Sequence, residues 1–220
     1  MQGYGKIEDS ENDPGTLVHI LESDEVGYWP ELGEGGDWTA LNDAYIYFAN
    51  NGDTIRDNIT VGQGAYSNLI GPELMFAHEL DAYYDDPILI IKTAWGGLSL
   101  AEDFRPPSAA GTTGAYYEDM IETAYEVTQN LGAEFPELGV TDFEISGFAW
   151  FQGWNDGAST EFLEEYEENL NYLINDVRSD FGNMDMPMVV ANSGHGGFVL
   201  SNDLWVQNIQ NIVSVAQENV

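Results

Sequence analysis

The sequence predicts an α/β protein built as a three-layer α/β/α sandwich on a mostly parallel sheet. First, several short apolar runs show no polar alternation, as expected of strands that helices cover on both faces; the clearest are 88–91, 145–151 and 188–191. Second, strand-like and helix-like segments alternate along the chain, which is the order that places helices on both faces of a parallel sheet. We therefore expect ligands at the carboxyl ends of the strands.

Local signals place each element in order. Thr16 is a suitable N-cap for a short helix, and the aromatic-rich run 44–49 predicts a strand closed by a turn at 50–53. Gly71-Pro72-Glu73 opens a second helix, with proline in the first turn and an acid beside the positive helix end. Apolar spacing gives the rest: strands at 88–91, 143–151 and 188–191, and helices at 116–131, at 160–181 and from Asn202 or Asp203 through Ala216. Residues 60–68 and 93–114 are predicted loops.

Length and composition favour one folded domain. A chain of 220 residues can bury one sizeable core, so we expect a single domain over residues 1–220. No apolar run reaches the roughly 18–20 residues that span a bilayer, and no signal peptide is visible, so we expect no membrane partner. Cysteine is absent, which excludes disulfides and thiolate chemistry.

The charge balance is extreme. The chain has 39 acidic residues and 5 basic ones, for a formal net charge of −34. Such a surface repels phosphate backbones, so we expect no nucleic-acid partner. Because the carboxylates are spread along the whole chain, we interpret them as a halophilic surface, since salt screens the repulsion within a few Å. The alternative is an acidic protein from an ordinary organism. With carboxylates so abundant, their spacing indicates neither a glycosidase-type acid pair nor a calcium site.

Three strand ends share small residues with an amide, a lysine or a histidine. They are 92–97, 151–156 and 192–197. In a parallel sheet these ends lie along one edge and can line one pocket. A backbone N–H from Gly96–Gly97, together with the side-chain amide of Asn155, would make an oxyanion hole for acyl transfer.

Each of these features also has a purely structural interpretation. The glycine pair can be only a turn, and Asn155 or Asp156 can simply cap the next helix. His195 between glycines is more typical of a loop residue than of a catalytic base. Lys92 and Arg105 are most simply explained by ion pairs with carboxylates, and less simply by a substrate.

The residues alone identify no nucleophile. The chain has no Gly-x-Ser-x-Gly elbow. Ser99, Ser108 and Ser193 lie in predicted loops, and none has a visible base nearby in sequence. Ser99 or Ser193 acting with His195 is one unrelated arrangement that stays open.

Together and in order, the motifs resemble the SGNH hydrolases. Gly153-Trp-Asn-Asp156 resembles their Gly-x-Asn-Asp block, and Gln152-Gly153 resembles the Gln-Gly of the sialate O-acetylesterase-like and carbohydrate esterase family 6 branch. Residues 90–100 resemble the glycine block of that branch, and 103–108 its continuation. Gly-Pro-Glu at 71–73 is a further shared feature, so the similarity runs through nearly the whole chain.

The resemblance implies a flavodoxin-like fold and hydrolysis of acetyl esters on carbohydrates. It implies a serine nucleophile with a histidine and usually an aspartate, and no metal or other cofactor. The oxyanion hole would combine the nucleophile's own N–H, the N–H of Gly97 (or Gly96) and the side chain of Asn155, with Gln152 beside them. Lining the pocket, we expect as substrate-binding residues Trp95, Gly96, Trp154, Asp156 and Arg105.

The chain departs from that branch at two motifs. Gly-Gln-Ser-Asn, which carries the nucleophile there, is not found, and neither is Asp-x-x-His. Met1-Gln2-Gly3 resembles the residues that follow the first of these boxes. We therefore expect a fragment trimmed at both ends. The strand it lacks would lie between 44–49 and 88–91, so we expect the isolated chain to be poorly stable or to aggregate.

These expectations define a main hypothesis and a rival. The main one is a serine carbohydrate O-acetylesterase acting on an acetylated carbohydrate or another small ester, with this chain alone inactive. The rival is a non-catalytic carbohydrate-binding protein that keeps the pocket and stacks sugars on its exposed aromatics Trp29, Trp38, Trp95 and Trp154. The resemblance suggests a secreted or periplasmic location.

Overall fold

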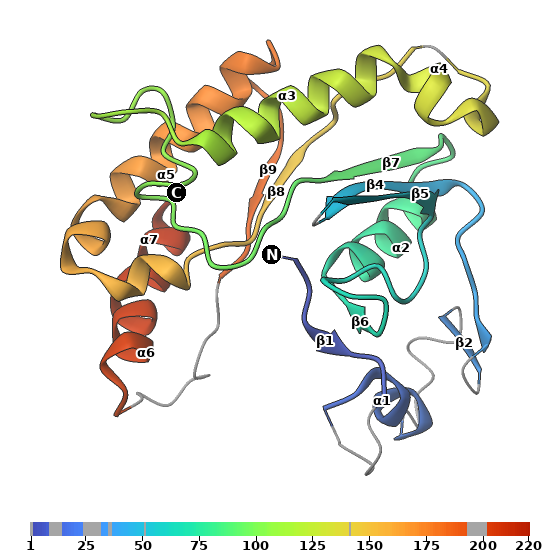
Figure 1. Cartoon of the computed structure of the whole chain (residues 1–220), viewed down its shortest axis with the longest axis horizontal. Helices are drawn as coiled ribbons and strands as arrows, with labels where there is room; N and C mark the ends of the chain where they lie inside the picture. The colour runs from blue at the N-terminus through green and yellow to red at the C-terminus, as the bar shows by residue number, and fades with distance from the viewer. Residues whose placement is uncertain are drawn as a thin grey trace. The chain divides into compact units, whose positions relative to one another are not determined.

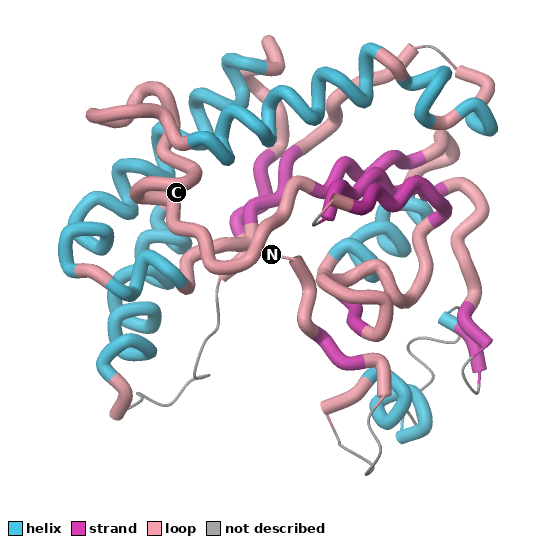
Figure 2. The backbone as a smooth tube through the Cα atoms, viewed as in Figure 1, coloured by secondary structure: helices cyan, strands magenta, loops and turns pink. Residues whose placement is uncertain are grey.

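The computed structural model describes residues 2–8, 15–23, 32–34, 37–50, 52–140, 142–192 and 202–220. These residues form two compact units, shown as a cartoon in Figure 1 and by secondary structure in Figure 2. The first unit comprises residues 1–96 with 130–140, and the second comprises 97–129 with 141–220. In the part of the chain that is described, no helix is both long and apolar enough to cross a membrane.

A three-stranded mixed sheet organises the first unit. Its strands are β4 (Ala44–Asn50), β5 (Asp53–Asn58) and β7 (Ile88–Lys92), in the order β5-β4-β7. β4 and β5 form an antiparallel hairpin, whereas β4 and β7 pair in parallel with Ile46 opposite Ile90. β-Branched and aromatic side chains suit such a pleated, covered surface. The predicted strands at 44–49 and 88–91 are therefore confirmed.

Smaller elements complete the first unit. β1 (Gly5–Lys6) pairs antiparallel with β6 (Leu69–Ile70), and β2 (Gly33–Glu34) pairs with β3 (Asp37–Trp38). The helices are α1 (Leu17–Ser23), α2 (Glu73–Tyr83), α4 (Leu131–Glu134) and the 3₁₀ turn η2 (Pro136–Leu138). Thr16 caps α1 as predicted, since its Oγ1 accepts a hydrogen bond from the His19 N–H at 3.3 Å.

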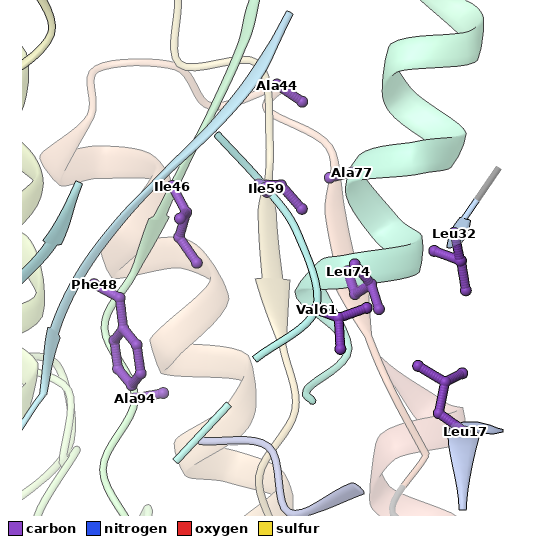
Figure 3. Close-up of a cluster of buried hydrophobic side chains, with 10 residues drawn as sticks. All are labelled: Leu17, Leu32, Ala44, Ile46, Phe48, Ile59, Val61, Leu74, Ala77 and Ala94. Atoms are coloured by element: carbon purple, nitrogen blue, oxygen red, sulfur yellow. The ribbon is translucent and has the colours of Figure 1, made fainter. Parts of the chain in front are cut away.

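The core of the first unit lies between β4 and α2. Ala44, Ile46 and Phe48, which alternate along β4, are fully buried, and they belong to one apolar cluster with Leu74 and Ala77 of α2 (Figure 3). This alternation follows from the period of two along a strand. The two-residue period explains why one face of β4 carries the core.

A buried ion pair holds the end of β7. Lys92 Nζ lies 2.9 Å from Glu73 Oε1, and both side chains are 6% exposed. The ammonium also donates to the carbonyl oxygens of Gln2 at 2.7 Å and Gln63 at 2.9 Å. Burial lowers the pKa of Lys92, and the nearby Glu73 carboxylate opposes that shift. The predicted carboxylate partner of Lys92 is confirmed, and Lys92 anchors three segments of this unit.

The second unit contains several helices and a short parallel pair of strands. These are β8 (Phe148–Trp150) and β9 (Met188–Val190), with Phe148 opposite Met188. The helices are α3 (Ala115–Gln129), the 3₁₀ turn η3 (Asn155–Ala158), α5 (Thr160–Asp180), α6 (Leu204–Asn208), the π-helical turn η4 (Ile209–Val213) and α7 (Ser214–Asn219). Ser159 caps α5, and Asp203 caps α6 through a bond from the Val206 N–H.

The sheet differs from the predicted one. The residues that the structure describes form a mixed α/β fold with small separate sheets, and not one extended parallel sheet. β5 was not predicted, because Asp-Thr-Ile-Arg-Asp-Asn has no apolar run and reads as polar turn residues. The predicted strand at 143–151 is regular only over 148–150, since residues 142–147 are mostly exposed. The single domain over all 220 residues stays a prediction.

The expected gap between 44–49 and 88–91 is contradicted. A strand offers two hydrogen-bonding edges, and β4 uses one for β5 and the other for β7. The two strands that were expected to flank a missing strand are direct neighbours over five residue pairs. No unpaired edge is therefore left between them.

Candidate active site

The candidate site lies in the second unit, where the chain leaves β8. The strand ends at Trp150, and residues 151–154 lead into η3, which begins at Asn155. Burial changes sharply over this turn: Trp154 is 40% exposed, whereas Asp156 is fully buried. The turn therefore presents Trp154 to solvent and directs the Asp156 side chain toward the loop that follows Gly97.

Asn155 and Gly97 are brought together. The Asn155 side-chain amide Nδ2 donates a hydrogen bond to the Gly97 carbonyl oxygen. Gly97 is exposed and has a φ of +78°, a left-handed conformation that glycine adopts without strain. No heavy atom lies within 4 Å of the position that a Cβ would occupy there, so the backbone is open to a ligand on that side.

The carboxylate of Asp156 organises the loop after Gly97. It accepts hydrogen bonds from the backbone N–H groups of Leu100 at 3.0 Å and Ala101 at 3.0 Å, and a further one from Gln152 Nε2. Because this carboxylate is fully buried, it does not face solvent. The structure thus gives Asp156 a different place from the substrate-facing one that we expected: it holds the backbone that carries Gly97.

Asp156 should make folding stability depend on pH. Burial raises the pKa of Asp156 from 3.8 to about 6, and hydrogen bonds from Gln152, Leu100 and Ala101 oppose the shift. Because the pKa is higher in the folded state, the folded protein binds more protons between these two values. The stability that the protonated Asp156 contributes is therefore present below about pH 4, and it is lost as the pH rises through about 6.

The measurement is the free energy of unfolding of the chain minus that of Asp156→Asn, as a function of pH. All other carboxylates are common to both proteins, so the difference isolates Asp156. We expect the difference to fall between about pH 4 and about pH 6. A difference that stays constant over this window would contradict the burial of an ionisable group at this position.

Gln152 connects the loop to the C-terminal helix. Its Nε2 also donates to the Leu98 carbonyl oxygen at 3.1 Å. Its own carbonyl oxygen accepts from Gln217 Nε2 at 2.6 Å and from the Tyr166 hydroxyl at 3.2 Å. Tyr166 and Gln217 are buried and also bond to each other. Tyr166 was predicted only as part of the α5 apolar stripe, and no sequence signal distinguished Gln217.

Trp154 stacks on Trp205 of α6. The ring centroids are 5.5 Å apart and the planes are inclined by 21°. Trp205 Nε1 also donates to the Trp154 carbonyl oxygen at 2.7 Å. Sequence reasoning selected Trp154 and missed Trp205, because one tryptophan in a short helix is not distinguishable from an ordinary packing residue.

Arg105 is bound within the protein. Its NH2 lies 2.8 Å from Glu165 Oε1, and NH1 donates to Glu165 Oε2 at 3.2 Å and to the Ala110 carbonyl oxygen at 2.7 Å. The two nitrogens of a guanidinium group match the two oxygens of a carboxylate in spacing, so both hydrogen bonds can form at once. The carboxylate ion pair, which was the simpler interpretation of Arg105, is confirmed, and the proposed contact with substrate is not needed to explain this residue.

The other predicted residues lie outside this arrangement. Trp95 and Gly96 belong to the first unit, where a Cβ on Gly96 would lie 2.8 Å from Gln2 Oε1. Ser193 and His195 lie outside the described residues, as does Trp29.

Ser99 and Ser108, which lie in the predicted loop at 93–114, have acidic partners. Ser99 Oγ donates to Asp103 Oδ2 at 3.0 Å, and Ser108 Oγ donates to Asp176 Oδ1 at 2.6 Å. Within the described ranges, no serine side chain bonds to a histidine. The described part of the site therefore contains Gly97 and Asn155 without an assembled serine nucleophile and histidine base.

One cavity of the second unit lies apart from Gly97, Gln152, Asn155 and Asp156. An open cavity of about 760 Å³ runs along α3 and is lined by residues that include Tyr117, Glu118 and Tyr125. It contains none of the predicted site residues. The grouping of Gly97, Gln152, Asn155 and Asp156 is defined by their hydrogen bonds and exposure.

Two solved structures are similar to this chain, and the likeness to the first shows a related fold. A protein from Arabidopsis thaliana is 16% identical, with a TM-score of 0.53 over 78% of this chain. A carbohydrate acetylesterase from Xanthomonas citri is also 16% identical, with a TM-score of 0.48 over 79% of this chain. The chain spans 63% and 40% of the lengths of these two proteins. No curated protein sequence matches it.

The family comparison covers more of the chain than the two solved structures do. The profile described as "carbohydrate esterase, sialic acid-specific acetylesterase" matches residues 1–220, which is the whole chain. A match of this extent includes both strand ends that carry Gly97 and Asn155. This chain therefore belongs to the carbohydrate esterase, sialic acid-specific acetylesterase family.

Proposed function

We propose that the protein is a serine carbohydrate O-acetylesterase in which this chain supplies the oxyanion-stabilising groups. The observation that carries the proposal is the hydrogen bond from Asn155 Nδ2 to the carbonyl of the exposed Gly97. An amide nitrogen carries two hydrogens. One is taken by Gly97, which fixes the amide plane, and the other can donate to an ester oxygen that becomes negative during acyl transfer.

The second donor is the Gly97 N–H. The left-handed backbone of Gly97 leaves its side open, so an acetyl group can approach closely. Asp156 and Gln152 keep the loop in place by bonding to Leu98, Leu100 and Ala101. Donors that are already oriented stabilise the developing charge without reorganising during the reaction. In this proposal Gly97 and Asn155 contact the reacting atoms, whereas Asp156 and Gln152 are positioning residues.

The nucleophile and its base are not assigned to any described residue. Gly-Gln-Ser-Asn and Asp-x-x-His are both missing from the 220 residues. In the proposal, a serine oxygen attacks the ester carbonyl while a histidine takes the serine proton, and the histidine then gives this proton to the sugar oxygen as the bond between that oxygen and the acetyl carbon breaks; neither residue is among those described. The acetyl-serine formed is then hydrolysed, which releases acetate and restores the serine hydroxyl.

The test is hydrolysis of p-nitrophenyl acetate by the 220-residue chain and by the protein encoded by the complete reading frame. We expect the complete protein to release p-nitrophenol and the chain alone to remain at the background rate. Turnover by the chain well above background would refute the hypothesis that these 220 residues lack the nucleophile. Inactivity of a complete protein that carries Gly-Gln-Ser-Asn and Asp-x-x-His would refute the esterase.

A second candidate is a non-catalytic carbohydrate-binding protein. The observation that favours it is the exposed Trp154–Trp205 stack beside a site without an assembled nucleophile. The coding sequence separates the two candidates. A reading frame without either catalytic box would favour the binding protein.

A further inference from the structure

The C-terminal helix contacts the turn that carries Asn155 at three backbone carbonyl groups. This helix comprises α6, η4 and α7, which follow one another without a break over residues 204–219. Its three donors to the turn at 152–157 are Trp205 Nε1 to the Trp154 oxygen at 2.7 Å, Asn208 Nδ2 to the Gly157 oxygen at 3.1 Å and Gln217 Nε2 to the Gln152 oxygen at 2.6 Å. The acceptors lie on both sides of Asn155 in the sequence.

A π-helical turn brings these donors to one face of the C-terminal helix. In an unbroken α-helix, which turns about 100° per residue, Gln217 would lie about 120° around the axis from Trp205. The π-helical turn at Ile209–Val213 holds about one extra residue, which reduces this angle to about 20°. Turns of this kind are rare and are frequent at functional sites. The interruption of the α-helix therefore aligns Gln217 with the other two donors.

The C-terminal helix packs directly on the turn. A Cβ on Gly157 would lie 2.8 Å from Trp205 Cδ1 and 2.6 Å from Ile209 Cδ1. Gln217 is only 5% exposed, and its Nε2 also donates to the buried Tyr166 hydroxyl at 3.0 Å. A buried polar network whose donors and acceptors are bonded to one another is rigid. The backbone at this end of the turn is therefore held in place before any ligand binds.

The contacts of the C-terminal helix with the turn join uncharged groups. Residues 204–217 contain no Asp, Glu, Lys or Arg, although the whole chain has 39 acidic residues. Side-chain amides and indoles donate to carbonyl oxygens without titrating. The two candidate oxyanion donors thus have separate supports. The ionisable Asp156 holds the loop that carries Gly97, and the uncharged C-terminal helix holds the turn that carries Asn155.

We propose that the C-terminal helix orients the Asn155 amide, with Gln217 and Asn208 as positioning residues for acyl transfer. They restrain one backbone carbonyl before Asn155 and one after it, so the Asn155 side chain keeps its direction toward the developing oxyanion. The effect on turnover rests on the proposed function. The effect on the Asn155 amide does not, because it can be observed in the chain alone.

The first experiment is hydrolysis of p-nitrophenyl acetate by the protein encoded by the complete reading frame. Gln217→Met keeps an unbranched side chain and removes the N–H donor. We expect kcat to fall by about tenfold with KM unchanged, because a displaced donor stabilises the transition state less well. Asn208→Ala should lower kcat in the same way. Asn219→Ala is the matched control, since Asn219 lies on the same helix and donates to Glu167 Oε1 at 3.4 Å, so its kcat should be unchanged.

Gln217→Met in an Asn155→Ala background separates positioning from a general loss of stability. With no amide left to orient, the second substitution should lower kcat by less than about twofold. An equal loss of about tenfold in both backgrounds would overturn the proposal. A kcat within about twofold of the parent in both Gln217→Met and Asn208→Ala would also overturn it.

The second experiment requires no turnover. In the ¹⁵N-labelled 220-residue chain, the side-chain NH₂ resonances of Asn155 should move in Gln217→Met and in Asn208→Ala, and should stay in place in Asn219→Ala. Resonances that stay in place in both positioning variants would overturn the proposal. An inactive complete protein would refute the esterase and leave this measurement to decide the positioning role, so the two proposals fail separately.

Discussion

Asn155→Ala in the protein encoded by the complete reading frame is expected to lower kcat by about 100-fold to 1000-fold, because it removes one of the two proposed oxyanion donors. The side chain that is lost donates to the Gly97 carbonyl oxygen in the free protein. KM for a small ester should change little, since the interaction with the oxyanion strengthens only as charge develops. Steady-state hydrolysis of p-nitrophenyl acetate measures both constants.

Asn171→Ala serves as the control for this substitution. Asn171 is an exposed asparagine of α5 whose Nδ2 donates to the Glu167 carbonyl oxygen at 2.9 Å. The Asn171→Ala substitution removes the same kind of side-chain amide at a position without a proposed catalytic role, so kcat should equal that of the parent enzyme. An Asn155→Ala enzyme that keeps more than about a tenth of the parental kcat would exclude Asn155 as an oxyanion donor.

Asp156→Ala is expected to lower the free energy of unfolding by about 3–5 kcal/mol. The substitution removes a buried acceptor and leaves the N–H groups of Leu100 and Ala101 and the amide of Gln152 without it. A buried donor that loses its partner costs about 1–3 kcal/mol, and partial relaxation of the loop keeps the total below the full sum. Urea unfolding followed by circular dichroism measures the change.

Asp185→Ala is the comparison, because Asp185 is exposed. Removing it should change the free energy of unfolding by less than about 0.5 kcal/mol, as for most surface substitutions. If Asp156→Ala were as mild as Asp185→Ala, the loop from Leu98 to Ala101 would not depend on this carboxylate. The assignment of Asp156 as a positioning residue would then be wrong.

The helices were the most predictable part of the fold. The long helix was expected at 160–181 and spans Thr160–Asp180, because a regular apolar stripe marks it. β5 was not predictable, since the polar residues of Asp53–Asn58 are held in the sheet by pairing with β4 and not by their own apolar pattern. The run at 145–151 was predicted as part of a strand, yet only 148–150 pairs, because strand pairing depends on a partner that the sequence does not reveal.

The sequence predicted which two strand ends contribute to the site, but it did not predict the hydrogen bonds and ring contacts around them. Glycine after one strand and an amide after another correctly placed Gly97 near Asn155. The direction of Asp156 was not predictable, because an acid after an asparagine can equally face solvent or the protein interior. Gln217 and Trp205 come from distant helices, and their contacts with Gln152 and Trp154 follow only from tertiary packing.

The hydrogen bonds to Asp156 also bear on hydrogen exchange. Residues 98–104 form no helix or strand, and a loop of this kind usually exchanges its amide hydrogens with deuterated water quickly. Leu100 and Ala101 nevertheless donate their amides to a carboxylate that is fully buried. Their exchange requires opening of the contact between η3 and this loop, so these two amides should be protected together and lose protection together.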